Sequence, residues 1–240
     1  SEQGQTALMT AAMTGAPDAV RVLLANGAKV NAAEPLQDQT ALMWAASEGR
    51  TEAAALLVEF GANVKAKTKG GFTPLLFAVR NGHIAAAKLL LDHGANVNDV
   101  APDGTNALNM AVVNAYFELA AVLLDRGADP NMPDPRGSAL HTIAWLRKPG
   151  TDGAAGVGNT PHGPPVPQGN VDTLELAKRL LEHGANPNTT EPLQNQTALM
   201  WAAAEGRANA AALLIEFGAN VQAKTKGGFT PFLFAVRNGH

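Results

Sequence analysis

Apolar and polar positions alternate along this chain in a pattern that predicts pairs of short helices. In one representative stretch, the mostly apolar run between Thr73 and Gly82 predicts a first helix. Thr73 suits its N-cap, and Pro74 suits the first helical position, where a missing N–H costs nothing. After a turn at Gly82, the segment 84–93 predicts a second helix with its Ala and Leu side chains on one side. Gly94 ends that helix because glycine readily takes a positive φ, and the polar segment after it predicts an extended β-turn.

The same pattern returns along the chain with a nearly fixed period. A Gly-Ala pair follows each predicted second helix, and successive pairs lie 34, 33, 33, 57 and 34 residues apart. A period near 33 predicts a stack of similar helix-turn-helix units, because one pair of short helices cannot bury its apolar faces alone. Stacked units build one long surface rather than an enclosed pocket, which favours binding over catalysis. The six pairs are Gly27-Ala28, Gly61-Ala62, Gly94-Ala95, Gly127-Ala128, Gly184-Ala185 and Gly218-Ala219.

Four short motifs recur together in these units. They are Thr-Pro-Leu or Thr-Ala-Leu at the start of the first helix, Asn-Gly-His at the turn, a Leu-Leu pair, and Gly-Ala-Asn-Val-Asn after the second helix. In this combination, over nearly the whole chain, the sequence resembles the ankyrin-repeat family. The resemblance implies a mainly α-helical solenoid of helix-turn-helix units joined by β-turn or hairpin loops, and a function in protein–protein interaction. One departure is Ala115-Tyr116, which stands where the Gly-His turn is expected.

The repeat pattern predicts a single array over residues 1–240. We expect units of roughly 1–34, 35–67, 68–100, 101–133, 134–190, 191–224 and an incomplete 225–240. The fifth unit carries an insertion at 149–169 with six Gly and five Pro, a composition that cannot pack a core. Its prolines favour either a flexible loop or a polyproline II segment that docks to a partner. A phosphate-binding loop is disfavoured, because no helix follows its glycines directly.

The chain also contains a long internal duplication. Residues 31–83 and 188–240 have the same sequence at 44 of 53 positions, including residues expected at the surface. Recent tandem duplication or deliberate engineering explains this identity most simply. The functional alternative is that the same surface is presented twice, so that one partner is held at two places with increased avidity.

Composition and charge narrow the function classes. The net charge of −3 and the isoelectric point near 6.1 argue against a general nucleic-acid surface. No run approaches 18 apolar residues, so we expect no membrane-spanning segment. The absence of Cys excludes disulfides and thiolate zinc sites but leaves the compartment open. No signal peptide is recognisable, although the chain starts inside a repeat and an upstream segment is compatible with that start.

Neither catalytic nor metal-binding patterns emerge from the titratable residues. None of the six His residues has a His, Asp or Glu partner at a metal-ligand spacing, so we expect no metal and no cofactor. His93 and His183 precede helix-ending glycines, where a cation interacts well with the helix dipole. His141 has the position that, by the resemblance, bonds between adjacent loops. Ser138 lies nearby but suits a helix cap, so no acyl-transfer site is predicted.

By the resemblance, a partner lies on the concave face made by the β-turn tips and first helices. Phe72 and Phe229 are the most informative positions there, because a turn residue between Gly and Thr rarely needs a phenyl ring for folding. Each ring is either an exposed contact beside an arginine or a cover for the neighbouring helix. Trp44 and Trp201, in the middle of first helices, are expected to pack in the core. The predicted partner-binding residues are Glu48, Lys69, Phe72, Arg80, Asn81, Trp145, Lys226, Phe229 and Arg237.

Both ends of the array lack a polar capping unit. A fragment of a longer protein is the simpler explanation, and stacking of the open end on another copy is the alternative. We therefore predict a non-enzymatic scaffold that binds a protein or peptide partner. A structural or self-assembling array is the alternative, and an enzyme or ligand site in the insertion is a distant one. The apolar residues expected to lie uncovered in the last unit are Phe232, Leu233, Phe234 and Val236.

Overall fold

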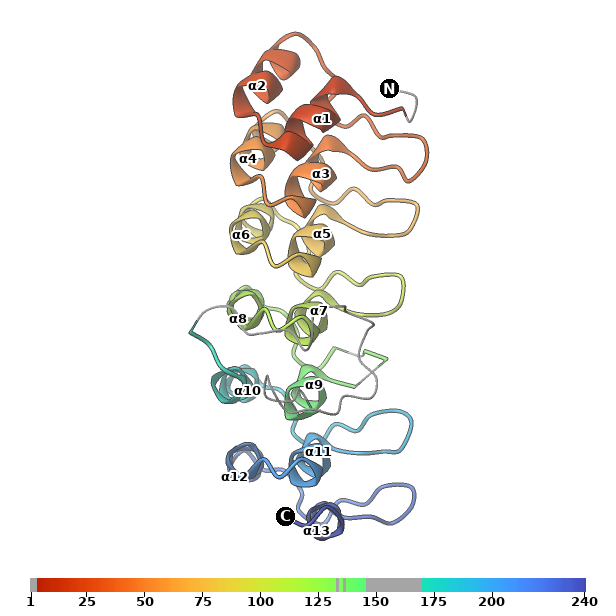
Figure 1. The fold of residues 1–240 in the computed structure, drawn as a ribbon, viewed down its shortest axis with the longest axis vertical. Coiled ribbons are helices and arrows are strands. Elements are labelled where there is room, and N and C mark those ends of the chain that lie inside the picture. Colours follow the sequence, from red (N-terminus) through yellow and green to blue (C-terminus); the bar gives the residue numbers. More distant parts are fainter. Residues whose placement is uncertain (1–3, 133, 136, 146–169) are drawn as a thin grey trace. The chain divides into compact units, whose positions relative to one another are not determined.

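The computed structural model describes residues 4–132, 134–135, 137–145 and 170–240. In these ranges the chain forms thirteen α-helices and no β-strand (Figure 1). The insertion at 149–169 and the side chain of Trp145 lie outside the described part, so the predictions for them stay predictions. The helices are α1 Ala7–Thr14, α2 Pro17–Ala25, α3 Ala41–Ser47, α4 Thr51–Glu59, α5 Pro74–Arg80, α6 Ile84–Asp92, α7 Ala107–Val113, α8 Phe117–Asp125, α9 Ala139–Trp145, α10 Thr173–Glu182, α11 Ala198–Ala204, α12 Ala208–Glu216 and α13 Pro231–Arg237.

The chain divides into two compact units, one of residues 1–110 with 125–128 and the other of residues 111–124 with 129–240. In the first unit, first helices pack on first helices (α1 on α3, α3 on α5) and second helices on second helices (α2 on α4, α4 on α6). In the second unit, α9, α11 and α13 pack in the same way, as do α10 and α12. These contacts confirm the predicted stack of helix-turn-helix pairs within each unit. The division of 1–240 into one array of seven repeats stays a prediction.

Local sequence explains how each helical pair begins and turns. The hydroxyl of Thr73 accepts a hydrogen bond from the backbone N–H of Leu76, and Pro74 occupies the first turn, as predicted. The turn between α5 and α6 uses Gly82 at φ 75°. At the corresponding turn before α8, Ala115 takes φ 57°, a left-handed conformation that costs an alanine about 1–2 kcal/mol. The Ala115 side chain is buried, and this turn therefore carries a small apolar side chain where the turn between α5 and α6 carries Gly82.

Neighbouring loops are joined by an asparagine hydrogen-bond pair. The side-chain amide of Asn31 donates to the backbone carbonyl of Gly61 at 3.0 Å, and its oxygen accepts from the backbone N–H of Asn63 at 2.7 Å. Asn188 makes the same two bonds to Gly218 and Asn220 at the same distances. The loops that carry Asn31 and Asn188 are therefore held to the next loop by side-chain hydrogen bonds as well as by helix packing.

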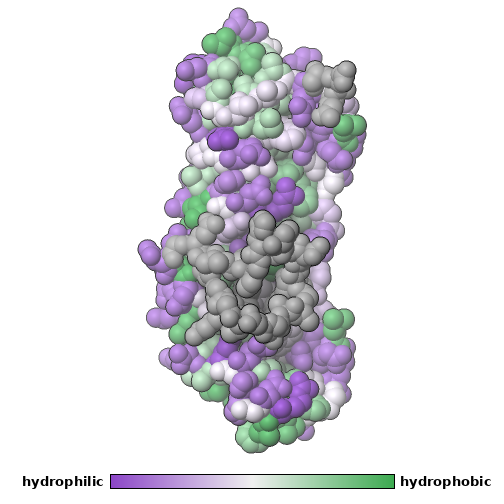
Figure 2. Space-filling view, in the orientation of Figure 1, coloured by the Kyte–Doolittle hydropathy of each residue, from purple (hydrophilic) through white to green (hydrophobic). Residues whose placement is uncertain are grey.

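The surface of α13 carries a group of neighbouring exposed apolar residues (Figure 2, lower end). Phe232, Leu233 and Val236 are 72%, 44% and 56% exposed, as predicted for residues without a covering helix. The prediction for Phe234 is wrong, because this ring is only 6% exposed and packs 5.6 Å from the ring of Phe229. Trp44 and Trp201 are half-buried rather than fully buried. None of the helices in the described ranges is both long enough and apolar enough to cross a lipid bilayer.

Candidate functional site

The internal duplication places the same surface once in each compact unit. We call residues 31–83 the first copy and residues 188–240 the second copy. In each, a loop that we call the finger precedes a first helix: residues 34–39 before α3, and residues 191–196 before α11 (Figure 1). A single β-bridge closes the base of each finger, Ala33 with Thr40 and Thr190 with Thr197.

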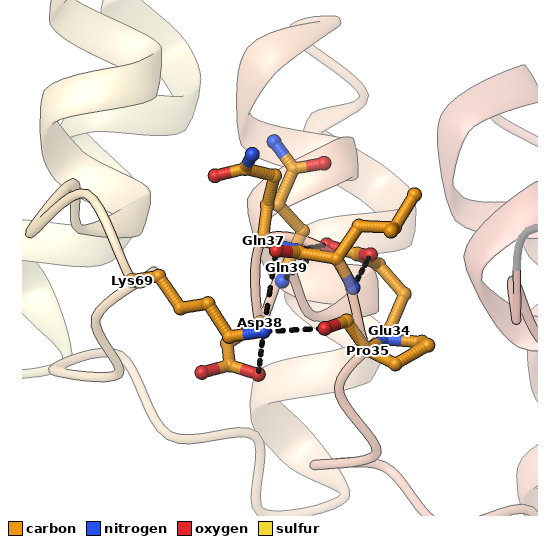
Figure 3. Close-up of polar contacts among 7 residues, drawn as sticks. Glu34, Pro35, Gln37, Asp38, Gln39 and Lys69 are labelled. Carbon is orange, nitrogen blue, oxygen red and sulfur yellow. Dashed lines mark hydrogen bonds and ion pairs between the residues drawn. The ribbon is translucent and has the colours of Figure 1, made fainter.

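A buried carboxylate organises the finger from inside. Glu34 is 4% exposed, and its carboxylate accepts backbone N–H bonds from Leu36 at 2.7 Å, Gln37 at 2.8 Å and Gln39 at 3.0 Å (Figure 3). Glu191 does the same for its finger, at 2.6, 2.7 and 3.0 Å. Burial raises the pKa of the Glu34 carboxyl. The backbone N–H donors and the charge of Lys69 together lower the pKa by more than burial raises it, so the net shift is downward. Glu34 is therefore charged at neutral pH and fixes the finger in one conformation.

Two of the predicted partner-binding residues hold the fingers. The ammonium group of Lys69 donates to the backbone carbonyls of Pro35 and Leu36, and its backbone N–H donates to Gln37 (Figure 3). Lys226 makes the equivalent bonds to Pro192, Leu193 and Gln194 in the second unit. The lysine side chain stays half exposed, so it both supports the finger and forms part of its surface.

Phe72 packs on its own helix in a cluster with Phe77 and Arg80. The two ring centroids lie 5.4 Å apart, and the guanidinium carbon of Arg80 lies 5.3 Å and 5.2 Å from them. The half-buried ring of Phe72 thus packs against α5 and beside the exposed Arg80, and its contact with a partner stays a prediction. Within the described residues, Arg80 has no carboxylate within 4.0 Å. We call these three residues, and their counterparts in the second copy, the aromatic–arginine cluster.

The second copy reproduces the aromatic–arginine cluster closely. Phe229 and Phe234 lie 5.6 Å apart, and the guanidinium carbon of Arg237 lies 5.6 Å and 5.1 Å from their centroids. Phe229 is 38% exposed. Stacking over two rings restricts the arginine. Arg237 Nε also donates to the side-chain oxygen of Asn238 at 3.4 Å, and the residue stays exposed.

The remaining predicted residues lie at the ends of the first helices. The side-chain amide of Asn81 donates to the carbonyl of Ser47 at 2.7 Å and thus joins α5 to α3. Glu48 follows Ser47 as an exposed residue at the end of α3. Between α11 and α13, the surface has a shallow groove of about 210 Å³. It is lined by Gln196, Met200, Trp201, Ala204, Glu205, Phe234, Arg237 and Asn238.

One serine–histidine pair has the hydrogen bond that acyl-transfer chemistry needs, but its surroundings assign it to structure. The Ser138 hydroxyl lies 2.9 Å from His141 Nδ1, and the backbone N–H of Ser138 donates to the same nitrogen. Because Nδ1 accepts, Nε2 carries the proton and donates to the backbone carbonyl of Gln196 at 3.0 Å. Burial lowers the pKa of His141, while its contacts with Gln196 and Glu191 oppose that shift. Both side chains are buried, so the pair joins adjacent loops, as the resemblance implied.

Some of this site escaped sequence reasoning. The buried role of Glu34 and the contribution of Phe77 to the cluster were missed. The sequence did signal the longer finger, because the two finger-bearing spacings between Gly-Ala pairs are 34 residues rather than 33, but this spacing does not identify Glu34 as the buried acceptor. Among the described residues, no group of three or more His, Asp or Glu side chains is placed to hold a metal ion.

Comparisons with known proteins agree with this geometry. A family model described as ankyrin repeats, in three copies, matches residues 1–68, 60–134 and 168–240. The crystal structure of the ankyrin repeat domain of Bcl-3, described as a unique member of the IkappaB protein family, aligns with a TM-score of 0.76 and 25% identity over 97% of this chain and 95% of that one. The human ASB11 ankyrin repeat domain aligns with a TM-score of 0.70 and 24% identity over 96% and 92%. None of the curated proteins compared with the chain matches it.

Proposed function

Because this chain belongs to the ankyrin-repeat family, we propose that it is a non-enzymatic scaffold that binds a protein or peptide partner along the face formed by its fingers and first helices. Ankyrin-repeat domains generally bind protein partners. The observation that carries the proposal is the aromatic–arginine cluster, which has the same geometry in both copies. Arginine and aromatic residues are enriched among the side chains that dominate binding energy at protein interfaces.

The charge and surface of the chain agree with a protein ligand. The net charge of −3 does not favour nucleic acid, and neither a metal nor a cofactor forms part of the proposal. The shallow groove between α11 and α13 combines apolar Met200 and Phe234 with charged Glu205 and Arg237. Such a mixture suits a peptide backbone and its side chains better than a small molecule, which needs a more enclosed pocket. The enzymatic alternative rests on the insertion at 149–169, outside the described residues.

Replacing Phe72 and Phe229 together by Ala should weaken partner binding about 30-fold, because each cluster loses the ring that supports its arginine. The partner, isolated by affinity capture on the unmodified chain, is titrated by calorimetry, and thermal melting is recorded in parallel. Phe60→Ala with Phe217→Ala is a matched control, because these two rings, 41% and 36% exposed, belong to the same duplicated sequence but lie at the ends of second helices. Unchanged affinity with a lower melting temperature would assign the clusters to folding alone.

A second candidate function is self-association through the α13 face, favoured by the exposure of Phe232, Leu233 and Val236. Apolar surface of this kind marks interaction sites. Light scattering over a concentration series separates the two functions. A monomer at high micromolar concentration would exclude self-assembly and leave partner recognition.

A further inference from the structure

We propose that the two fingers are equivalent binding elements, each of which inserts an exposed leucine into the same uncharged apolar pocket of a partner protein, so that one chain binds two molecules of that partner. The leucines are Leu36 in finger 34–39 and Leu193 in finger 191–196. This inference rests on the proposed function and specifies where the partner is held, by what chemistry and how many times.

The two fingers are one residue longer than the described loops 68–72, 101–105 and 225–229. In the longer finger, the backbone N–H of Glu34 bonds to the carbonyl of Gln39, five residues on. In the shorter loops, Thr68 bonds to Phe72 and Ala101 bonds to Thr105, four residues on. The extra residue accounts for the 34-residue spacing between the Gly-Ala pairs that flank each finger. It occurs in both copies and therefore defines a loop type that the rest of the described chain lacks.

Two local features stabilise the longer loop of each finger. The shorter loops place a glycine at the left-handed position, Gly71 and Gly104, whereas the fingers place Asp38 at φ 59° and Asn195 at φ 61° there. Asp and Asn adopt this conformation more readily than other residues with side chains.

The second feature is the buried carboxylate of Glu34. In the shorter loop, the hydroxyl of Thr68 accepts one backbone N–H, that of Phe72. In the finger, the carboxylate of Glu34 accepts three. A buried charge is tolerated only when it is hydrogen-bonded in this way, so the finger has little conformational freedom.

This rigid loop exposes a large apolar side chain. Leu36 is 63% exposed and Leu193 is 76% exposed. Closing such a loop does not require a leucine, since the shorter ones carry Lys69-Gly70-Gly71 and Pro102-Asp103-Gly104 at the same place. A leucine held out by a preorganised loop binds with a small loss of conformational entropy, which increases affinity.

The two copies define the chemistry of the pocket. Leu, both glutamines and the supporting lysine are kept, but Asp38 is replaced by Asn195. The charge at the tip therefore differs between the copies, and recognition common to both depends on the leucine and the amide side chains. A neutral apolar pocket bordered by hydrogen-bonding groups fits both fingers. Of the other eight differences between the copies, three lie on the second helices α4 and α12 and two directly precede the finger, and none changes a residue of the finger itself. The three are Thr51/Ala208, Glu52/Asn209 and Val58/Ile215, and the two are Ala32/Thr189 and Ala33/Thr190.

Site-specific photo-crosslinking tests the inference on the full chain. A diazirine analogue of leucine is placed at position 36 or 193, and at Val22 as a control that is 60% exposed on α2. In extracts of the source organism, we expect positions 36 and 193 to crosslink the same protein through the same peptide, and position 22 not to.

With that protein purified, calorimetry should give two binding sites per chain. Leu36→Ser should leave one site, and Leu36→Ser with Leu193→Ser should weaken binding about 100-fold, with unchanged circular dichroism.

Other outcomes would overturn the inference. Crosslinks to different proteins from the two positions, or unchanged affinity of the double leucine variant, would exclude equivalent leucine contacts. If that variant binds normally while the Phe72 and Phe229 variant does not, the proposed function stands and the finger inference fails. If neither surface affects binding, both fail. Leucine-dependent sedimentation with phosphatidylcholine vesicles would replace the protein pocket by a lipid surface.

Discussion

Leu76→Ala should lower the free energy of unfolding by about 3–5 kcal/mol, whereas Leu233→Ala, the same substitution in the second copy, should lower it by less than about 1 kcal/mol. Leu76 is completely buried in α5, and Leu233 is 44% exposed in α13. Truncating a buried leucine loses its transfer free energy and leaves a cavity, while an exposed leucine loses little of either. Apart from Leu75, which is Phe232 in the second copy, the two helices have the same sequence, so local helix propensity is nearly the same in both.

Urea unfolding measures this difference, and the chain supplies its own probes. Trp44 lies in the first copy and Trp201 in the second, so Trp→Phe variants separate the fluorescence of the two compact units, with Trp145 replaced in both. Separate probes are needed because repeat proteins do not always unfold in one cooperative step. An equally large effect of Leu233→Ala would contradict the exposed state of α13. Sedimentation velocity would then show whether a second copy covers it.

Glu34→Ala should destabilise the first unit by about 2–4 kcal/mol, because three backbone N–H groups of the finger lose a charged acceptor. The substitution should also reduce acid sensitivity. The pKa of Glu34 is lower in the folded chain than in the unfolded chain. Its contribution is therefore fully present above the unfolded value of about 4.3, and is lost as pH falls through the lower folded value.

The measurement is unfolding at several pH values between 7 and 3, with amide hydrogen exchange of Leu36, Gln37 and Gln39 as a local readout. Glu52→Gln is the matched control, because Glu52 is exposed on α4 near the same finger in sequence. Glu34 is preferred to Glu191 for this test, since the latter also interacts with the titrating His141. Equal acid sensitivity in the unmodified chain and the Glu34 variant would show that the carboxylate does not hold the finger.

Sequence reasoning succeeded where structure depends on nearby residues. The cap at Thr73, the proline at position 74 and the glycine turn at position 82 all act within a few residues, and all were confirmed. The period of Gly-Ala pairs predicted the stacking of helical pairs because a small pair has no other way to bury its apolar side.

The surface was harder to predict, because each side chain there meets groups from a neighbouring repeat or loop. Nothing in the sequence says that the ammonium of Lys69 reaches the carbonyls of Pro35 and Leu36, more than thirty residues away. Phe234 was expected to be exposed, because the prediction considered cover from a following helix only. In the structure, the ring of Phe229 packs against it instead. The partner itself depends on a second molecule, and family membership fixes the fold rather than the ligand.

The central claim, that the finger face of each copy binds one molecule of the same partner, is tested most directly by methyl NMR of the full chain titrated with that partner. We expect the signals of Leu36 and Leu193 to shift together and to saturate at two sites per chain. Signals of Val58 and Ile215, on the second helices α4 and α12, should stay unchanged. Shifts confined to Val58 and Ile215, with Leu36 and Leu193 unaffected, would contradict the claim.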